Sequence, residues 1–170
     1  MATQTDSSSS FSSSFSSSSW KYDVFLSFCG DDTRKKFTDH LYTALKQKGI
    51  ITFRDDEKLE RGKCISQELL KAIEESKYAV IVLSSNYASS KWCLKELATI
   101  VGCMKENRLT VLPVFHYVDP SDVRNQTETP FIEAFAKHEK DPKINIQDVQ
   151  EWKAALKEVG NISGWHLHDR

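Results

Sequence analysis

From residue 20 onward, short apolar runs alternate with segments whose apolar residues recur every three or four positions. The runs predict strands at 22–28, 50–53, 78–83 and 109–115, with a last short strand at 164–167. The intervening spacing is that of amphipathic helices. Alternation of strands and helices is typical of βαβ units, in which a parallel sheet is covered on both faces. We therefore predict an α/β fold, a flavodoxin-like doubly wound parallel sheet of about five strands with helices on both faces.

Each predicted helix carries an apolar stripe that is expected to face the core. The stripes are Phe37, Leu41, Ala44 and Leu45; Leu69, Leu70 and Ile73; Leu94, Leu97, Ala98 and Val101; and Trp152, Ala155, Leu156 and Val159. A further short helix is predicted at 131–140. These segments would cover the sheet.

Pro113 is an unusual residue inside the fourth predicted strand. Proline has no N–H to donate to a ladder, so within sheets it is confined to edges and bulges. We therefore expect one side of this strand to be poorly paired.

The first nineteen residues differ in composition from the rest of the chain. Eleven of the thirteen residues from Ser7 to Ser19 are serine. Such a segment cannot bury enough apolar surface to offset the entropy of ordering it. We expect a disordered serine-rich tail over 1–19 and one folded domain over 20–170. No secretory signal and no apolar run of about 18 residues is present, so neither export nor a membrane span is predicted.

Charge and cysteine content narrow the choice of partner and compartment. The 170 residues carry a formal net charge of -1, with acids and bases interspersed. That balance provides no basic face for nucleic acid or an anionic membrane, and neither partner is expected. Cys29, Cys64, Cys93 and Cys103 lie in apolar or mixed segments without a CxxC pair. Buried free thiols in a reducing compartment are predicted, in the cytoplasm with the nucleus left open, and no metal site is predicted.

The loops that follow the strands decide between the functions this scaffold can carry. A phosphoreceiver needs an acidic pair after the first strand, which Asp31 and Asp32 supply. It also needs an aspartate at the end of the third strand, where the chain has Ser84, Ser85 and Asn86. Glycine-rich phosphate-binding motifs are missing as well. The sequence therefore favours neither a receiver nor a conventional redox dinucleotide site.

Six motifs stand in a fixed order along the folded part of the chain. They occupy residues 22–34 (YDVFLSFCGDDTR), 53–56 with 59–62, 68–76, 84–97, 113–115 with 118–124, and 163–165. Together they resemble plant Toll/interleukin-1 receptor (TIR) domains over residues 22–167. The first motif departs from the family pattern at Cys29, where the family usually has arginine.

The resemblance implies two activities that occur together in plant intracellular immune receptors. One is cleavage of NAD-type dinucleotides, with NAD or NADP as substrate and no cofactor, and the other is signalling by self-assembly in defence and cell death. It also implies that Glu96 is the catalytic residue. Independently of the family, Trp92 and Glu96 share a helix face opposite the apolar stripe, so we expect Glu96 to point away from the core. The fold would place Glu96 and Arg34 along one cleft.

One carboxylate suffices for the implied chemistry. Cleavage of the N-glycosidic bond builds positive charge on the ribose ring, as in glycoside hydrolysis, and a nearby carboxylate stabilises that charge. Nicotinamide leaves a cationic nucleotide as a neutral molecule, so no general acid is required. Glu96 is therefore expected to be decisive without a second catalytic acid.

The resemblance also implies a set of residues around the dinucleotide. They are Phe28, Cys29, Gly30, Arg34, Arg61 and Trp92. Trp92 either stacks on a base or ribose or is a core or rim aromatic, and the sequence leaves both open. A neutral thiol at Cys29 cannot pair with a phosphate, which would weaken binding roughly ten- to a hundred-fold if the family's arginine makes that contact.

Assembly is the second expectation from the resemblance, with other TIR domains as partners. It implies that a neighbouring protomer completes the cleft with its loop at 56–65. Asp39, His40 and Gly164 match positions of the family's self-association faces. The chain ends at Arg170, where the family's last helix would begin, and it is either a stand-alone protein or the N-terminal piece of a larger receptor. The alternative function is a non-catalytic homotypic interaction module or adaptor with a cleft impaired by Cys29.

Overall fold

A computed structural model describes residues 20–54 and 67–168 of the chain. In chain order the elements are β1 (Tyr22–Phe28), α1 (Gly30–Thr33), the π-helical turn η1 (Arg34–Thr38), α2 (Asp39–Gln47), β2 (Thr52–Arg54), α3 (Gln67–Glu74), β3 (Ser76–Leu83), the 3-10 turn η2 (Tyr87–Ser89), α4 (Lys91–Lys105), β4 (Thr110–His116), α5 (Pro120–Asn125), α6 (Phe131–Lys140), α7 (Ile146–Gly160) and β5 (Trp165–Leu167).

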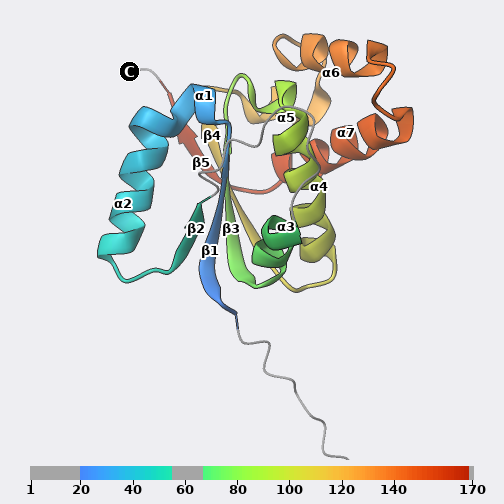
Figure 1. The fold of residues 1–170 in the computed structure, drawn as a ribbon. Coiled ribbons are helices and arrows are strands. Elements are labelled where there is room, and N and C mark those ends of the chain that lie inside the picture. Colours follow the sequence, from blue (N-terminus) through green and yellow to red (C-terminus); the bar gives the residue numbers. More distant parts are fainter. Residues whose placement is uncertain (1–19, 55–66, 169–170) are drawn as a thin grey trace, which may run out of the picture.

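The strands form one parallel sheet in the order β2-β1-β3-β4-β5 (Figure 1). This confirms the predicted flavodoxin-like α/β fold with helices on both faces. The order reverses between β1 and β3, because the connection after β1 leads outward to β2 and the one after β3 leads outward to β4. Ligands of open α/β sheets bind at the carboxyl ends of the strands beside such a reversal.

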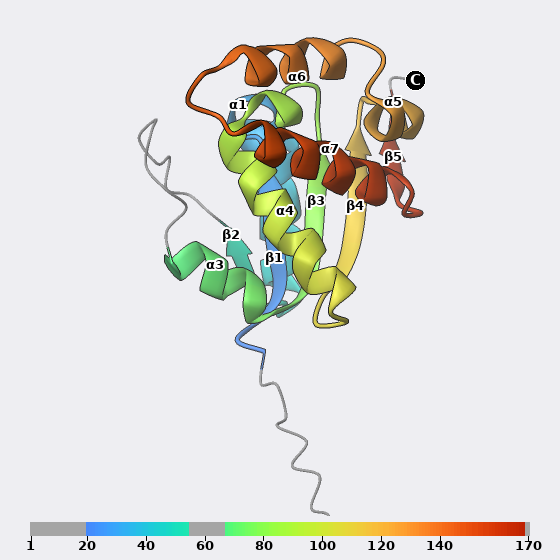
Figure 2. The same cartoon turned by 90° about the vertical axis from the view of Figure 1, so that its right-hand side faces the viewer.

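One face of the sheet is covered by α3, α4 and α7, as Figure 2 shows. Alternate strand residues point toward these helices, among them Phe25, Ile81 and Phe115, which are exposed by no more than 1 %. The helix residues that meet them include Leu97 and Leu156, as the apolar stripes predicted. This is the main hydrophobic core.

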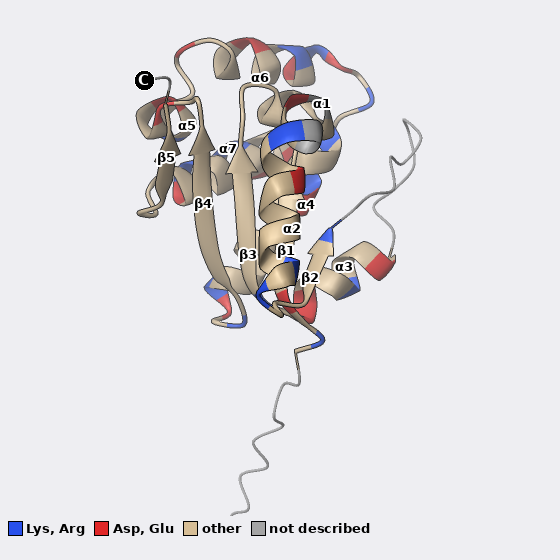
Figure 3. Cartoon of the chain, turned by 90° about the vertical axis from the view of Figure 1, so that its left-hand side faces the viewer, with Lys and Arg blue, Asp and Glu red and all other residues tan. Residues whose placement is uncertain are grey.

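The other face carries α2, which lies in front of β1, between β3 and β2 (Figure 3). Its buried cluster consists of Leu26, Phe28 and Val82, with the partly buried Phe37, Leu41, Tyr42 and Val80 packed against it. No residue of α2 is fully buried, and Ala44 is exposed. The predicted stripe on this helix faces the sheet, but its residues are at most half-buried, because only one helix among the described residues lies on this face.

Pro113 has a strand partner on one side only, which confirms the expectation for the fourth strand. It pairs with Ile81 of β3, while pairing with β5 begins one residue later, at Val114 and Trp165. Gly164 lies against this position, and a Cβ atom there would be 2.2 Å from the Pro113 carbonyl oxygen. Glycine at 164 is thus required by close packing within the chain.

Side-chain caps fix where the long helices begin. The Ser90 hydroxyl accepts a hydrogen bond from the backbone N–H of Cys93 and caps α4, and Asn145 caps α7 in the same way. Asp119 caps α5, with Pro120 as its first residue. Within the described ranges, no helix is long and apolar enough to cross a membrane.

Candidate functional site

The carboxyl ends of β1 and β3 meet at the reversal of strand order, and the polar residues that follow them lie together. Ser27 and Ile81 pair across the two strands, as do Phe28 and Val82. Cys29 and Gly30 then lead into α1, and residues 84–90 lead from β3 into α4. The motif at 22–34 and the motif at 84–97 thus build one place in the fold.

Asp32 joins these two connections. Its carboxylate accepts hydrogen bonds from the Ser84 hydroxyl at 2.5 Å, the Asn86 backbone N–H at 2.8 Å and the Asn86 side-chain amide at 2.7 Å. The receiver comparison and the motifs at 22–34 and 84–97 include these residues, but neither predicts that they bond to one another. Their contact follows from topology, because each lies within four residues of the end of one of two adjacent strands.

Glu96 is buried, which contradicts the expectation that it points away from the core. Its exposed fraction is 3 %, and in the first two turns of α4 only Lys91 and Lys95 are exposed. Helix α4 contacts α3, α7 and η2 as well as strands β1 and β4, so more than its sheet-facing side is covered. Periodicity identified the apolar face correctly, but it could not show that other elements close over the opposite face.

Tyr87 lies near Glu96 and is completely buried. Its hydroxyl donates to the Cys93 carbonyl oxygen at 3.2 Å and shares a hydrogen bond of 2.8 Å with the Ser27 hydroxyl. Burial raises the pKa of Tyr87 well above its usual value, and its neighbours Cys93 and Glu96 raise it further. The phenol is therefore neutral and ties η2 to β1 and to the first turn of α4.

Cys29 and Cys93 are two neighbouring thiols at this site. Both thiols are free and buried, as the sequence predicted, and the Cys93 Sγ donates to the Phe28 carbonyl oxygen at 3.6 Å. A hydrogen bond with Cys29 raises the pKa of Cys93 well above its usual value, and burial and Glu96 raise it further. Neither group supplies positive charge for a phosphate.

The other residues expected around the dinucleotide have different outcomes. Trp92 is half-buried and packs against the main core, so it lies at a rim, where either predicted role is open. Gly30 begins α1. Arg34 begins η1, but its side chain lies outside what the structure describes. Arg61 and the loop at 56–65 lie outside the described residues.

The three predicted interface residues lie on two different elements. Asp39 pairs with Arg54 of β2 at 2.5 Å, and the Arg54 guanidinium also lies over the Tyr42 ring at 4.3 Å. His40 is exposed beside it on α2. Gly164 is already accounted for by its packing on Pro113. Asp39 and His40 are adjacent at the start of α2, whereas Gly164 precedes β5 at the far edge of the sheet from β2.

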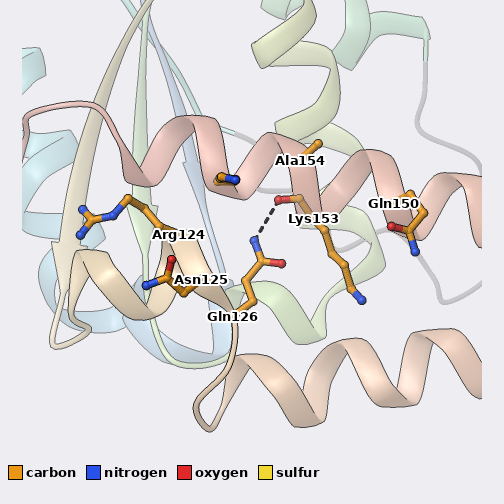
Figure 4. Close-up of a pocket in the computed structure, with 7 residues that line it drawn as sticks. Arg124, Asn125, Gln126, Gln150, Lys153 and Ala154 are labelled. Carbon is orange, nitrogen blue, oxygen red and sulfur yellow. Dashed lines mark hydrogen bonds between the residues drawn. The ribbon is translucent and has the colours of Figure 1, made fainter.

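A hollow of about 340 Å³ lies between α5 and α7 (Figure 4). It is lined by Arg124, Asn125, Gln126, Gln150, Lys153, Ala154 and Lys157. Lys153 pairs with Glu139, and Arg124 donates to the Gly160 carbonyl oxygen. None of the lining residues belongs to β1, β3 or α4, so this hollow is separate from the candidate site.

Comparison with known proteins gives consistent matches over the folded part. The family model described as TIR domain matches residues 21–170. TMV resistance protein N of Nicotiana glutinosa is 55% identical over 152 residues, which is 89% of this chain and 13% of that protein. Disease resistance protein RPV1 of Vitis rotundifolia is 55% identical over 169 residues, which is 96% of this chain and 12% of that protein.

A solved structure described as the activated Roq1 resistosome directly recognizing the pathogen effector XopQ (TIR domains) matches in fold and sequence. Its TM-score is 0.77 at 53% identity, over 86% of this chain and 87% of that chain. The chain therefore spans nearly the whole of this TIR structure but only about an eighth of the curated relatives.

Proposed function

This chain belongs to the TIR domain family, and from that premise we propose that it hydrolyses NAD or NADP, releasing nicotinamide, when assembled with other TIR domains. The reaction would signal plant defence and cell death, since the relatives include plant disease resistance proteins. The observation that carries the proposal is the burial of Glu96 at the carboxyl ends of β1 and β3, where this fold class binds ligands.

A carboxylate in this position is suited to the charge that develops in the reaction. The glycosidic bond between ribose C1′ and the nicotinamide nitrogen lengthens, positive charge accumulates on the ribose, and Glu96 stabilises it. Water then bonds to C1′ and loses a proton, while nicotinamide keeps the bonding electrons and leaves neutral. Because Tyr87 and Cys93 are held neutral, Glu96 supplies the negative charge among these neighbours.

Cys29 is expected to weaken dinucleotide binding. It is buried at the end of β1, and its thiol offers no positive charge to a diphosphate. A hydrogen bond to a charged group contributes about 1.5–3 kcal/mol, so its loss corresponds to roughly ten- to a hundred-fold in affinity. The same observation favours the second candidate function, a non-catalytic module that acts through homotypic TIR contacts.

Assembly is proposed as the step that completes the cleft. The Roq1 structure is described as a resistosome with TIR domains, and it shares 53% of its sequence with this chain. We expect the loop at 56–65 of one protomer to reach the cleft of the next. Asp39, His40 and Gly164 remain the proposed positions of contact, and neither nucleic acid nor membrane is expected to take part. A cytoplasmic location, with the nucleus left open, remains part of the proposal.

The test measures nicotinamide release from NAD and NADP with the chain fused to a domain that forces self-association. Glu96→Ala should lower release about a hundred- to a thousandfold, because deletion of a group that stabilises developing charge costs about 2.7–4 kcal/mol. Glu133→Ala, an exposed glutamate on α6, is the matched control and should match wild type. If wild type releases no more nicotinamide than Glu96→Ala, the enzyme proposal fails and the interaction module stands.

Cys29→Arg distinguishes a cleft that binds the dinucleotide weakly from one that has no activity. An arginine there should lower KM roughly ten- to a hundred-fold if it reaches a phosphate. If activity appears only in this variant, the cysteine is what silences the cleft. An unchanged KM would show that residue 29 does not face the dinucleotide.

A further inference from the structure

The connection that leads into α4 is held from outside by a single carboxylate. Ser84 and Asn86 stand 52 and 54 positions from Asp32 in the sequence, yet all three of their nearby donors bond to its two oxygens. Charge-assisted hydrogen bonds of this length are about twice as strong as neutral ones. Asp32 is the link between the β1–α1 connection and the β3–α4 connection.

The link continues without interruption to Glu96. Asn86 precedes η2, where Tyr87 bonds to Ser27 of β1 and to the Cys93 carbonyl oxygen. Ser90 then caps α4 through the Cys93 N–H. Glu96 is one turn beyond Cys93, on the helix whose start these contacts fix.

The same contacts fix the start of α4 at two points. Tyr87 fastens η2 to β1 from inside the core, and Asp32 fastens the residues before η2 from the rim. Without Asp32, the buried Ser84 hydroxyl, which is 1 % exposed, loses its acceptor. The connection could then shift while the core beneath it stays packed.

We propose that Asp32 is a positioning residue for Glu96, holding the entry to α4 so that the buried carboxylate stands at a fixed place in the cleft. This inference rests on the proposed function. Asp32 acts through Ser84, Asn86 and the helix, and it makes no contact with the reacting atoms. A misplacement of about 1 Å at a catalytic group can cost about a hundredfold in rate.

The test compares Asp32→Ala with Asp32→Asn in the self-associating fusion. Asp32→Ala removes all three acceptors and should lower kcat roughly ten- to a hundred-fold, with KM within about threefold of wild type. Asp32→Asn should retain most of kcat. Its carbonyl oxygen can accept from Ser84 and from the Asn86 backbone, and the Asn86 amide can turn to accept from the new NH₂ group. Asp148→Ala, an exposed aspartate in the first turn of α7, is the matched control.

Amide hydrogen exchange supplies a readout that does not depend on activity. In Asp32→Ala the amides of residues 84–93 should exchange faster, while those of β3 and the rest of α4 should not. Unchanged exchange at 84–93 overturns the proposal, even if activity falls. Faster exchange with unchanged kcat also overturns it.

If the proposed function fails, nicotinamide release and amide exchange give a different combination of results from failure of the Asp32 proposal. If wild type releases no nicotinamide, the catalytic claim fails at Glu96, and exchange at 84–93 alone decides whether Asp32 holds the entry to α4. If Asp32→Ala does not fold, Asn86→Ala, which removes only the side-chain amide bond, takes its place with smaller changes in the same directions. No change in either quantity in Asn86→Ala would then overturn the proposal.

Discussion

The sheet face under α4 and the face under α2 are built from the same strands, and both bury strand residues completely, yet the helix residues over the two faces are buried to different depths. Phe25 and Leu26 are adjacent in β1 and point to opposite faces. Phe25 joins a core that α3, α4 and α7 cover together, whereas Leu26 joins a small cluster under α2 (Figures 2 and 3). An amphipathic stripe thus identifies the face that a helix turns to the sheet but not the depth of its burial.

The difference matters for the candidate site. Glu96 and Tyr87 belong to the deeply covered side, where a carboxylate and a phenol are both removed from water. Asp39 and His116 belong to the thinly covered side and remain partly exposed. Electrostatic interactions are stronger where water is excluded, so the side with the thicker cover is the one suited to the proposed catalysis.

The largest expected effect comes from truncating one leucine on each face. Leu97→Ala on α4 removes a fully buried side chain and should lower the free energy of unfolding by about 2–5 kcal/mol. Leu41→Ala on α2, whose leucine is half-buried, should cost about half as much. Urea titration measures both through the midpoint at unchanged slope. Equal losses would show that the two faces are packed equally well.

Two tyrosines, one on each face, compare a buried hydroxyl with a partly exposed one. Tyr87→Phe removes the hydroxyl that bonds to Ser27 and Cys93 and should cost about 1–3 kcal/mol, because Ser27 is left buried without this partner. Tyr42→Phe on α2 keeps the ring beneath Arg54 and should cost less than about 0.5 kcal/mol. Thermal unfolding of the two variants gives the comparison. A larger loss of stability in Tyr42→Phe than in Tyr87→Phe would contradict this prediction.

The ion pair of the thinly covered face should contribute less. Asp39→Asn breaks the contact with Arg54, and since the Asp39 side chain is 48% exposed, the expected loss is about 0.2–1 kcal/mol. Raising the salt concentration should shrink the difference from wild type, because exposed charges are screened. A loss that is independent of salt would mean that packing of Arg54 on Tyr42, and not charge, holds β2 to α2.

The smallest effect is on the pH dependence of stability. A residue of the thinly covered face should lower stability at acid pH, and a residue of the deeply covered face should lower it at alkaline pH. Burial lowers the pKa of His116 below its usual 6.5, so the unfolded chain binds this proton more readily, and stability should fall slightly as pH drops below about 6.5. Tyr87 has a raised pKa, so its contribution should be lost as pH rises above about 10. Stability against pH in His116→Gln and Tyr87→Phe checks each limit. An unchanged acid limb in His116→Gln would contradict the first.

Prediction from sequence succeeded where a signal is local. The seven-residue run of β1 was predicted with its observed limits, because aromatic and aliphatic residues predominate between a polar flank and the turn at Gly30. The second strand was predicted at 50–53 but is Thr52–Arg54. Ile50 instead closes the turn after α2 through the Leu45 carbonyl oxygen, and Ile51 is 59% exposed. Ile50 and Ile51 have the apolar character of a strand, but the register with β1 begins only at Thr52.

The candidate site shows the same division. The motifs singled out Glu96, Trp92 and Cys29, and all three positions lie within the residues that the family model matches. Periodicity on α4 gave the wrong exposure for Glu96, because the pattern along one helix cannot show how much of the helix other elements cover. Asp32, Ser84 and Asn86 carry no local signal for one another.

The sequence by itself determined most of the long elements, the α/β class and the family, since strand and helix periods depend on backbone geometry over a few residues and motifs are read in order. The tertiary structure alone decided how thickly each face of the sheet is covered, that Glu96 is buried, and that Asp32 bonds to residues more than fifty positions away. Burial and long-range hydrogen bonds depend on which elements meet, and a pattern along one element does not contain that information.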